Sequence, residues 1–239
     1  MKKGLSKVNM TKPIAATLSL IVWFAGVQTT PNASAQAPVS STSSAGVLPG
    51  LQLRGSTQTM FATLIKEAGL SGGAAGSNQG CSRPPVRDVS IPAGTNFENA
   101  IALVAKLGPG SKWNVQGGVV VLLPDGVVPP LLQVQIQSFT WNKSMPVREV
   151  LDRIRQLPEV TGAAAKLGLA EAPFEGGASS ICLRGSCGEE ARPQVVETEQ
   201  NVPLVALLNR VAQAHQAVWD YSEFRCERGI LFSLGVLAE

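Results

Sequence analysis

Apolar residues along this chain change their spacing from one block to the next, and each spacing predicts a structural element. The first block predicts a helix over 56–68 from residues that recur on one helical face, namely Met60, Phe61, Leu64, Ile65 and Ala68. Gly69 ends this helix. The run that follows, 72–80, is rich in Gly and Ser and predicts a loose loop that leads to Cys81.

A strand, a helix and a hairpin are predicted in that order over 89–123. Residues 89–91 alternate like a strand, and Thr95 and Glu98 have the spacing of a helix capping box. An apolar helical face runs from there to Gly108. Gly117 and Gly118 then separate two extended runs, which predicts a hairpin with a two-residue turn.

The C-terminal part repeats this order. Residues 194–198 predict a strand, Asn201 and Pro203 predict the start of a helix, and 217–221 and 230–234 predict two more strands. An offset of 107 residues superposes one apolar helix face on the other, and an offset of 106 superposes Trp113 on Trp219. These offsets predict an internal duplication.

A partial third copy lies between the two. Residues 134–141 predict its strand, and 145–154 match 202–211 at an offset of 57. Pro158 ends that helix, and 161–169 predict a second, shorter one. We therefore expect an α+β fold of repeated βαββ modules, each packing one helix on a small, mostly antiparallel sheet. The expected boundaries are a first module over 56–130, a partial module over 131–169, a linker over 170–190 and a C-terminal module over 191–239.

The first 35 residues have the three parts of a secretory signal peptide. Four lysines precede an apolar stretch over 14–27, and small residues then allow cleavage between Ala35 and Gln36. A retained N-terminal anchor is the alternative for this segment, but after cleavage we expect no stable membrane anchor. Residues 36–55 are rich in Ser, Ala, Pro and Gly and predict a flexible leader. The mature protein is expected to be periplasmic or secreted.

Removing the signal peptide changes the charge balance. Four of the 20 Lys and Arg residues lie in the signal, which leaves 16 cations against 17 acidic residues. The mature chain has no run of basic residues that could neutralise a row of phosphates, so we expect no binding to nucleic acid. No cofactor motif is present, and we expect neither a cofactor nor a metal, because His215 is the only histidine.

All four cysteines lie in the mature chain, and an even count in an exported protein predicts disulfides. We expect Cys182–Cys187 as one pair, because a Gly-Ser turn brings the two thiols together, and Cys81–Cys226 as the other. Four cysteines allow three pairings, so a Cys81–Cys182 link is an alternative.

Ser71 and His215 are the candidate catalytic residues, and both have a plainer explanation. Ser71 lies in a G-x-S-x-G motif, but a nucleophile elbow needs a turn from a strand into a helix, and this motif follows a helix. His215 lies near the end of a predicted helix, where a cation interacts well with the helix dipole. We therefore expect no enzyme, with a secreted serine-type hydrolase as the alternative.

The remaining candidates are tryptophans and paired acids. Trp113 and Trp219 lie on predicted strands and are expected in the core, while Trp141, whose module is incomplete, is a possible contact for a partner. Glu197 and Glu199 share one face of a strand and are expected to be solvated.

The order of strand, helix and hairpin, with apolar positions such as Phe97, Ile101 and Val104, resembles the short N-terminal domain of bacterial secretins and TonB-dependent receptors. The resemblance covers 89–123 and 194–234, with 134–157 as a truncated version. In that family the domain docks periplasmic partners or the cell wall. The resemblance therefore implies an exported interaction module that binds an envelope protein or a cell-wall glycan.

Overall fold

The computed structural model describes residues 47–82, 84–108, 110–173 and 195–238. The signal peptide with its cleavage site, most of the leader, and Cys182 and Cys187 lie outside these residues. The described helices are α1 (Thr57–Glu67), α2 (Phe97–Ala105), α3 (Val147–Arg155), α4 (Pro158–Lys166) and α5 (Leu204–His215), with a 3₁₀ turn η1 (Pro130–Gln133). The strands are β1 (Leu51–Gly55), β2 (Gly72–Asn78), β3 (Arg87–Ile91), β4 (Ser111–Gln116), β5 (Val119–Pro124), β6 (Gln135–Asn142), β7 (Leu169–Glu171), β8 (Val196–Pro203), β9 (Val218–Cys226) and β10 (Gly229–Ala238).

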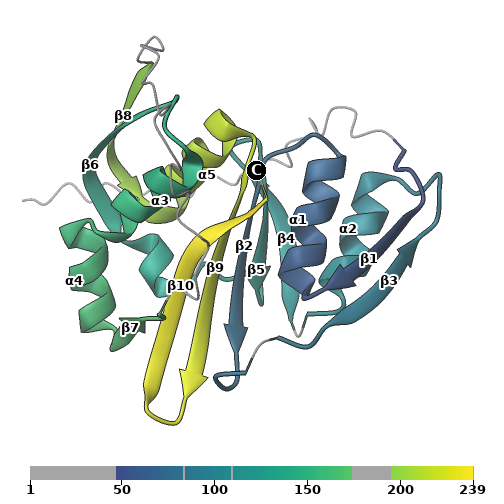
Figure 1. The fold of residues 1–239 in the computed structure, drawn as a ribbon, viewed down its shortest axis with the longest axis horizontal. Helices are drawn as coiled ribbons and strands as arrows, with labels where there is room; N and C mark the ends of the chain where they lie inside the picture. Colours follow the sequence, from purple (N-terminus) through teal and green to yellow (C-terminus); the bar gives the residue numbers. More distant parts are fainter. Residues whose placement is uncertain (1–46, 83, 109, 174–194, 239) are drawn as a thin grey trace, which may run out of the picture. The chain divides into compact units, whose positions relative to one another are not determined.

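A six-stranded mixed sheet, in the order β4-β5-β2-β9-β10-β7, runs through the middle of the fold (Figure 1). Two further sheets have two antiparallel strands each, β1 with β3 and β6 with β8. The fold class is α+β, as predicted. The prediction that each module has its own small sheet is wrong, because both hairpins, β4-β5 and β9-β10, belong to the same sheet.

The order and pairing of the elements occur twice in the chain. The first copy is β1-α1-β2-β3-α2-β4-β5, and the second is β6-α3-β7-β8-α5-β9-β10, with α4 inserted after α3. In each copy the first and third strands form the two-stranded sheet, and the second strand runs parallel to the last. Even the register agrees, since Gly72–Ala74 of β2 face 120–122 and Leu169–Glu171 of β7 face 230–232. This order, which occurs twice, contains more elements than the predicted βαββ module.

The two copies lie in the central sheet head to tail. In the first three strands, β5 and β2 are parallel and β4 is antiparallel to them. In the other three, β10 and β7 are parallel and β9 is antiparallel to them. Because β2 and β9 are parallel, each strand of the second set runs opposite to its counterpart in the first. A half-turn about an axis in the sheet, perpendicular to its strands, combined with a shift of three strands along that axis, relates them. The half-turn reverses strand direction and exchanges the faces. Strand β2 of the first copy and β9 of the second pair in parallel at the seam.

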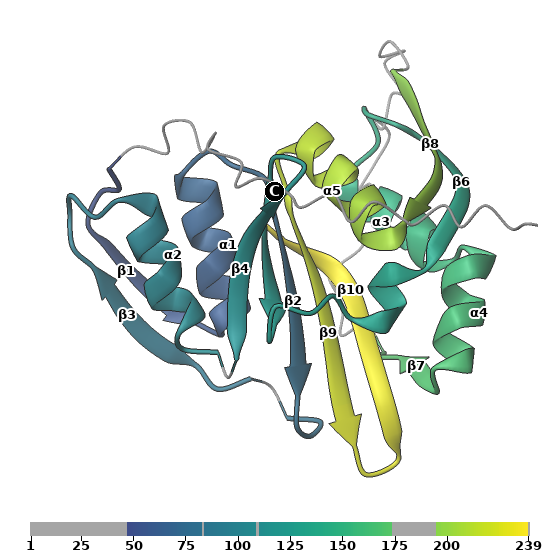
Figure 2. The same cartoon turned by 180° about the vertical axis from the view of Figure 1, so that it is seen from behind.

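This half-turn places the helices on opposite faces of the sheet. One core joins α1 and α2 to the β1-β3 sheet and to one face of the central sheet, including Ala74, Val120 and Val218. The other joins α3, α4 and α5 to the β6-β8 sheet and to the opposite face, including Ala75, Val121 and Trp219. The described residues thus form five layers, sheet, helices, sheet, helices and sheet (Figures 1 and 2).

Two segments predicted to lack regular structure are strands. Residues 72–78, predicted as a loop, form β2 in the middle of the sheet, where small side chains are required. A Cβ on Gly73 would lie 1.9 Å from the Trp219 ring. The leader prediction is wrong for β1, which pairs with β3, and the linker prediction is wrong for the end of β7, which pairs with β10.

Helix starts follow local chemistry only in the first copy. Ser56 caps α1 by accepting from the N–H of Thr59, and Asn96, not the predicted Thr95, caps α2 by accepting from the N–H of Asn99. Asn201 does not cap α5. It lies in β8 with φ 52°, and the helix begins after Pro203.

Candidate functional site

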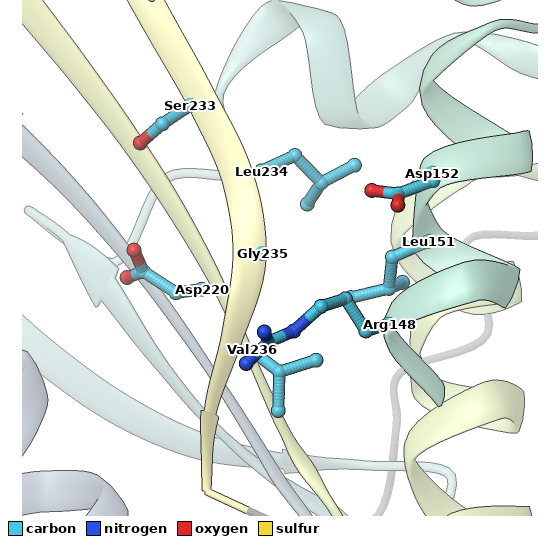
Figure 3. A pocket seen from close by; sticks show the side chains of 8 residues that line it. All are labelled: Arg148, Leu151, Asp152, Asp220, Ser233, Leu234, Gly235 and Val236. Atoms are coloured by element: carbon cyan, nitrogen blue, oxygen red, sulfur yellow. The ribbon is translucent and has the colours of Figure 1, made fainter. Parts of the chain in front are cut away.

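A hollow of about 170 Å³ lies beside β10 in the second copy. Strand β7 pairs with β10 only over 230–232, and the last hydrogen bond between them is donated by the N–H of Ala172 to the carbonyl oxygen of Phe232. Beyond that point no described residue pairs with the outer edge of β10 over 233–236. The hollow is lined by Arg148, Leu151, Asp152, Asp220, Ser233, Leu234, Gly235 and Val236 (Figure 3).

Helix α3 supplies one wall of the hollow. Leu151 is buried, and its neighbour Asp152 is ion-paired with Arg155. Arg155 also bonds to Glu171 of β7 at 2.7 Å, which ties the helix to that strand. Arg148 is exposed, and among the described residues it has no ion-pair partner. Figure 3 shows its guanidinium beside Val236 and Asp152 beside Leu234.

Asp220 contributes a buried carboxyl group from the opposite face of the sheet. It accepts a hydrogen bond from Gln58 Nε2 at 2.8 Å, and the same amide nitrogen donates to Ser222 Oγ at 3.0 Å. Burial raises the pKa of Asp220 to about 7, although a hydrogen bond with Ser222 lowers it in part. Since Gln58 belongs to α1 and Asp220 to β9, this contact joins the two copies.

The first copy has a hollow in the corresponding place, with a volume of about 280 Å³. It lies where β2 separates from β5, next to Leu122 and Pro124. Gln58 lines it as the second residue of α1, and Arg148 lines the other as the second residue of α3. Each copy therefore has a hollow in this place, and the second residue of the helix that lines it is Gln58 in one copy and Arg148 in the other.

The two candidate catalytic residues lie in separate parts of the fold. Ser71 lies between α1 and β2, so its motif runs from a helix into a strand, the reverse of a nucleophile elbow. Its carbonyl accepts from the N–H of Val120 and thereby holds β2 to β5. His215 lies half-buried in the last turn of α5. Neither residue lines the two hollows described above.

The tryptophans are mainly structural. Trp219 is buried and donates to Asn209 Oδ1 at 2.9 Å, and Trp113 is half-buried against the first core. Trp141 is 1% exposed, so the prediction that it contacts a partner is wrong for this arrangement. It packs beside Phe139, with ring centroids 5.8 Å apart.

Glu197 and Glu199 share one face of β8, as predicted, but both are half-buried and ion-paired. Glu197 pairs with Lys143, and Glu199 lies 3.7 Å from Arg210 of α5. Their predicted role as a fully solvated face is wrong.

Cys81 and Cys226 form a disulfide, as predicted. Cys81 follows β2 and Cys226 ends β9, so the bond joins the two parallel strands at the seam between the copies. The Cys182–Cys187 pair lies outside the described residues and stays a prediction.

Sequence reasoning missed Arg148 and Asp220, which line the hollow beside β10, and Gln58, which donates a hydrogen bond to Asp220. The one available signal was Asp220, an acid between Trp219 and Tyr221 in a strand. An acid that alternates with aromatic residues in a strand is ordinarily expected on a solvent face, but both faces of the central sheet are covered.

Within the described parts of the chain, no group of three or more His, Cys, Asp or Glu residues is arranged to hold a metal ion. None of the described helices is long and apolar enough to cross a membrane. No family model, curated protein or solved structure matches this chain.

Proposed function

We propose that the mature protein is an exported, non-catalytic interaction module that docks a protein partner in the cell envelope. The observation that carries this proposal is the hollow beside β10. It presents the cation of Arg148, which has no ion-pair partner among the described residues, apolar side chains from Leu151 and Val236, and the edge of a strand. Such a combination suits recognition of another chain, because apolar contacts and main-chain groups supply affinity while a charge selects the ligand.

Two further observations support this assignment. The disulfide between Cys81 and Cys226 fits an oxidising compartment, in agreement with the signal peptide expected over 1–35. The duplicated unit, which resembles in its sequence the docking domain of secretins and TonB-dependent receptors, occurs here on both sides of a seam rather than once.

Asp220 is better explained as a positioning residue than as a general acid or base. Its carboxyl group is held by Gln58, and the contact joins α1 to β9. A general acid or base must reach a substrate proton, whereas this group is engaged inside the protein.

The test is a capture experiment with the mature protein and an envelope extract, using chemical cross-linking and mass spectrometry. We expect one partner to be enriched, and its cross-links to fall on α3 and β10. The control is the Arg148→Glu variant, which should fold normally because Arg148 is exposed.

The alternatives have their own readouts in the same design. Co-sedimentation with purified cell-wall sacculi, with no captured protein, would show a glycan ligand instead of a protein partner. Hydrolysis of ester or peptide substrates that disappears in the Ser71→Ala and His215→Ala double variant would overturn the proposal in favour of a serine hydrolase.

A further inference from the structure

The main chain of β10 forms the floor of the hollow and has groups there with which no described residue pairs. The N–H of Ala172 donates to the carbonyl oxygen of Phe232 at 2.7 Å, so the main-chain groups of Phe232 point toward β7. Main-chain groups of alternate residues in a strand point to the same edge. The N–H and carbonyl of Leu234, and the N–H of Val236, therefore point to the outer edge, where no described residue pairs with them.

Strand β7 ends at Glu171, and among the described residues nothing continues the sheet alongside 233–236. Gly235, between Leu234 and Val236, has no side chain, and a Cβ placed on it would have nothing within 4 Å apart from its chain neighbours. Polar main-chain groups inside a partly enclosed hollow are stabilised by hydrogen bonds, and a second strand supplies them at regular spacing.

The side chains around this edge differ between its two faces. On the α3 face, Arg148 lies beside Val236, and Leu151 lies one helical turn further along, toward Leu234 (Figure 3). On the other face the lining groups are Ser233 and Asp220. In a strand laid along β10, residues two positions apart face the same side. An acidic side chain at one position would meet Arg148, and an apolar side chain two positions away would meet Leu151.

We propose that the edge of β10 at 233–236 binds an extended acidic-apolar segment of the partner protein by strand addition. This inference rests on the proposed function and names the chemistry of its ligand. The segment extends the sheet where β7 stops, its main chain pairs with Leu234 and Val236, and its carboxylate pairs with Arg148 in a charge-assisted contact.

The experiment uses the mature protein and short capped peptides of alternating Thr and Val that carry one central Glu, Gln or Lys. Titration calorimetry measures affinity, and amide hydrogen exchange followed by NMR locates the contact. We expect the Glu peptide to bind about tenfold more tightly than the Lys peptide, because one charge-assisted contact distinguishes them. Saturating peptide should slow exchange of the Leu234 N–H about tenfold or more.

Two variants separate charge from fold. Arg148→Glu should reverse the order of the peptides, while Lys106→Glu, an exposed charge reversal next to α2 of the first copy, should leave it unchanged. A Glu peptide with proline at each position facing β10 should not bind, since it lacks the N–H groups that pair with Leu234.

Three outcomes would overturn the inference. The first is a Leu234 amide that is already protected in the free protein, which would mean that the chain covers its own edge. The second is peptide binding without protection of Leu234 or Val236. The third is a lack of peptide binding. In each case, capture of an envelope protein would still support the proposed function, so the two failures are distinguishable.

Discussion

Replacing Asp220 with Asn should stabilise the folded protein, and by an amount that depends on pH. Burial raises the pKa of this carboxyl group from its ordinary value of 3.8 to about 7. The difference is about 3 units, and each unit corresponds to about 1.4 kcal/mol, so the ionised group destabilises the fold by up to about 4 kcal/mol. An Asn side chain removes this penalty and can still accept the hydrogen bond from Gln58.

The pH window follows from the two pKa values. Below about 4 the carboxyl group is protonated in both the folded and the unfolded chain, and the penalty is zero. Between about 4 and about 7 only the unfolded chain ionises, so the wild-type protein loses stability relative to the variant as pH rises. Above about 7 both states are ionised, and the difference stays at its maximum.

Urea unfolding at pH about 4, 6 and 8 measures this effect. The variant and the wild type should have equal free energies of unfolding at the lowest pH and should differ by several kcal/mol at the highest. Glu227→Gln, in the exposed turn between β9 and β10, is the matched control and should show no such trend. Equal stability of Asp220→Asn and wild type across the whole range would refute the reasoning.

Three other changes test the seam and the packing of the sheet. Replacing Cys81 and Cys226 with Ser should lower the free energy of unfolding by about 4–5 kcal/mol, since the bond closes a loop of 145 residues in the unfolded chain, and a loss of under 1 kcal/mol in urea would contradict this. Gly73→Ala should prevent the native fold from forming, because its Cβ would lie 1.9 Å from Trp219, and a soluble variant with a native-like circular dichroism spectrum would refute it. Gly162→Ala, with nothing within 4 Å in α4, should instead raise the thermal midpoint slightly.

The elements that the sequence predicted well are those whose pattern is local. The apolar faces of α1, α2, α3 and α5 are buried as expected, and the Gly117-Gly118 turn joins β4 to β5. In these segments the spacing of side chains alone determines which face is buried.

Strand β2 could not be predicted from the sequence, because its place in the sheet depends on a tertiary contact. Its residues are Gly, Ala, Ser and Asn, which have low β propensity. It lies in the middle of the sheet, where the Trp219 ring leaves no space for a Cβ at Gly73. The reason becomes visible only when β9, far away in the sequence, is placed beside it.

The length of the duplicated unit was also hidden from the sequence. The predicted offset of 107 aligns α2 with α5 correctly, but the offset of 106 predicted for the two tryptophans is wrong, because the paired strands show that the hairpins align at a different spacing. Gln116 faces Val119 at one turn and Cys226 faces Gly229 at the other, so Trp113 corresponds to Glu223 and not to Trp219. The middle segment is the first half of the second copy, because β6 and α3 occupy the places of β1 and α1.

The hollow was the least predictable feature of all. It depends on how far β7 pairs with β10, which is a contact between segments far apart in the sequence. Arg148 looked like an ordinary exposed residue of an amphipathic helix, and its place beside the edge of β10 depends on the packing of α3 on the sheet.

The half-turn that relates the two copies has a consequence for assembly. The symmetry operation of a dimer returns to its starting point after two steps. An operation that also moves three strands along the sheet does not, so its repetition would join β7 of one molecule to β4 of the next without end. Such an arrangement leads to fibres. Here β7 has only three residues before Pro173, and β4 exposes Lys112 on its open edge. A short strand, a proline and an edge lysine are the devices that keep sheet edges from pairing. They keep the two end strands of the described sheet from pairing with another molecule.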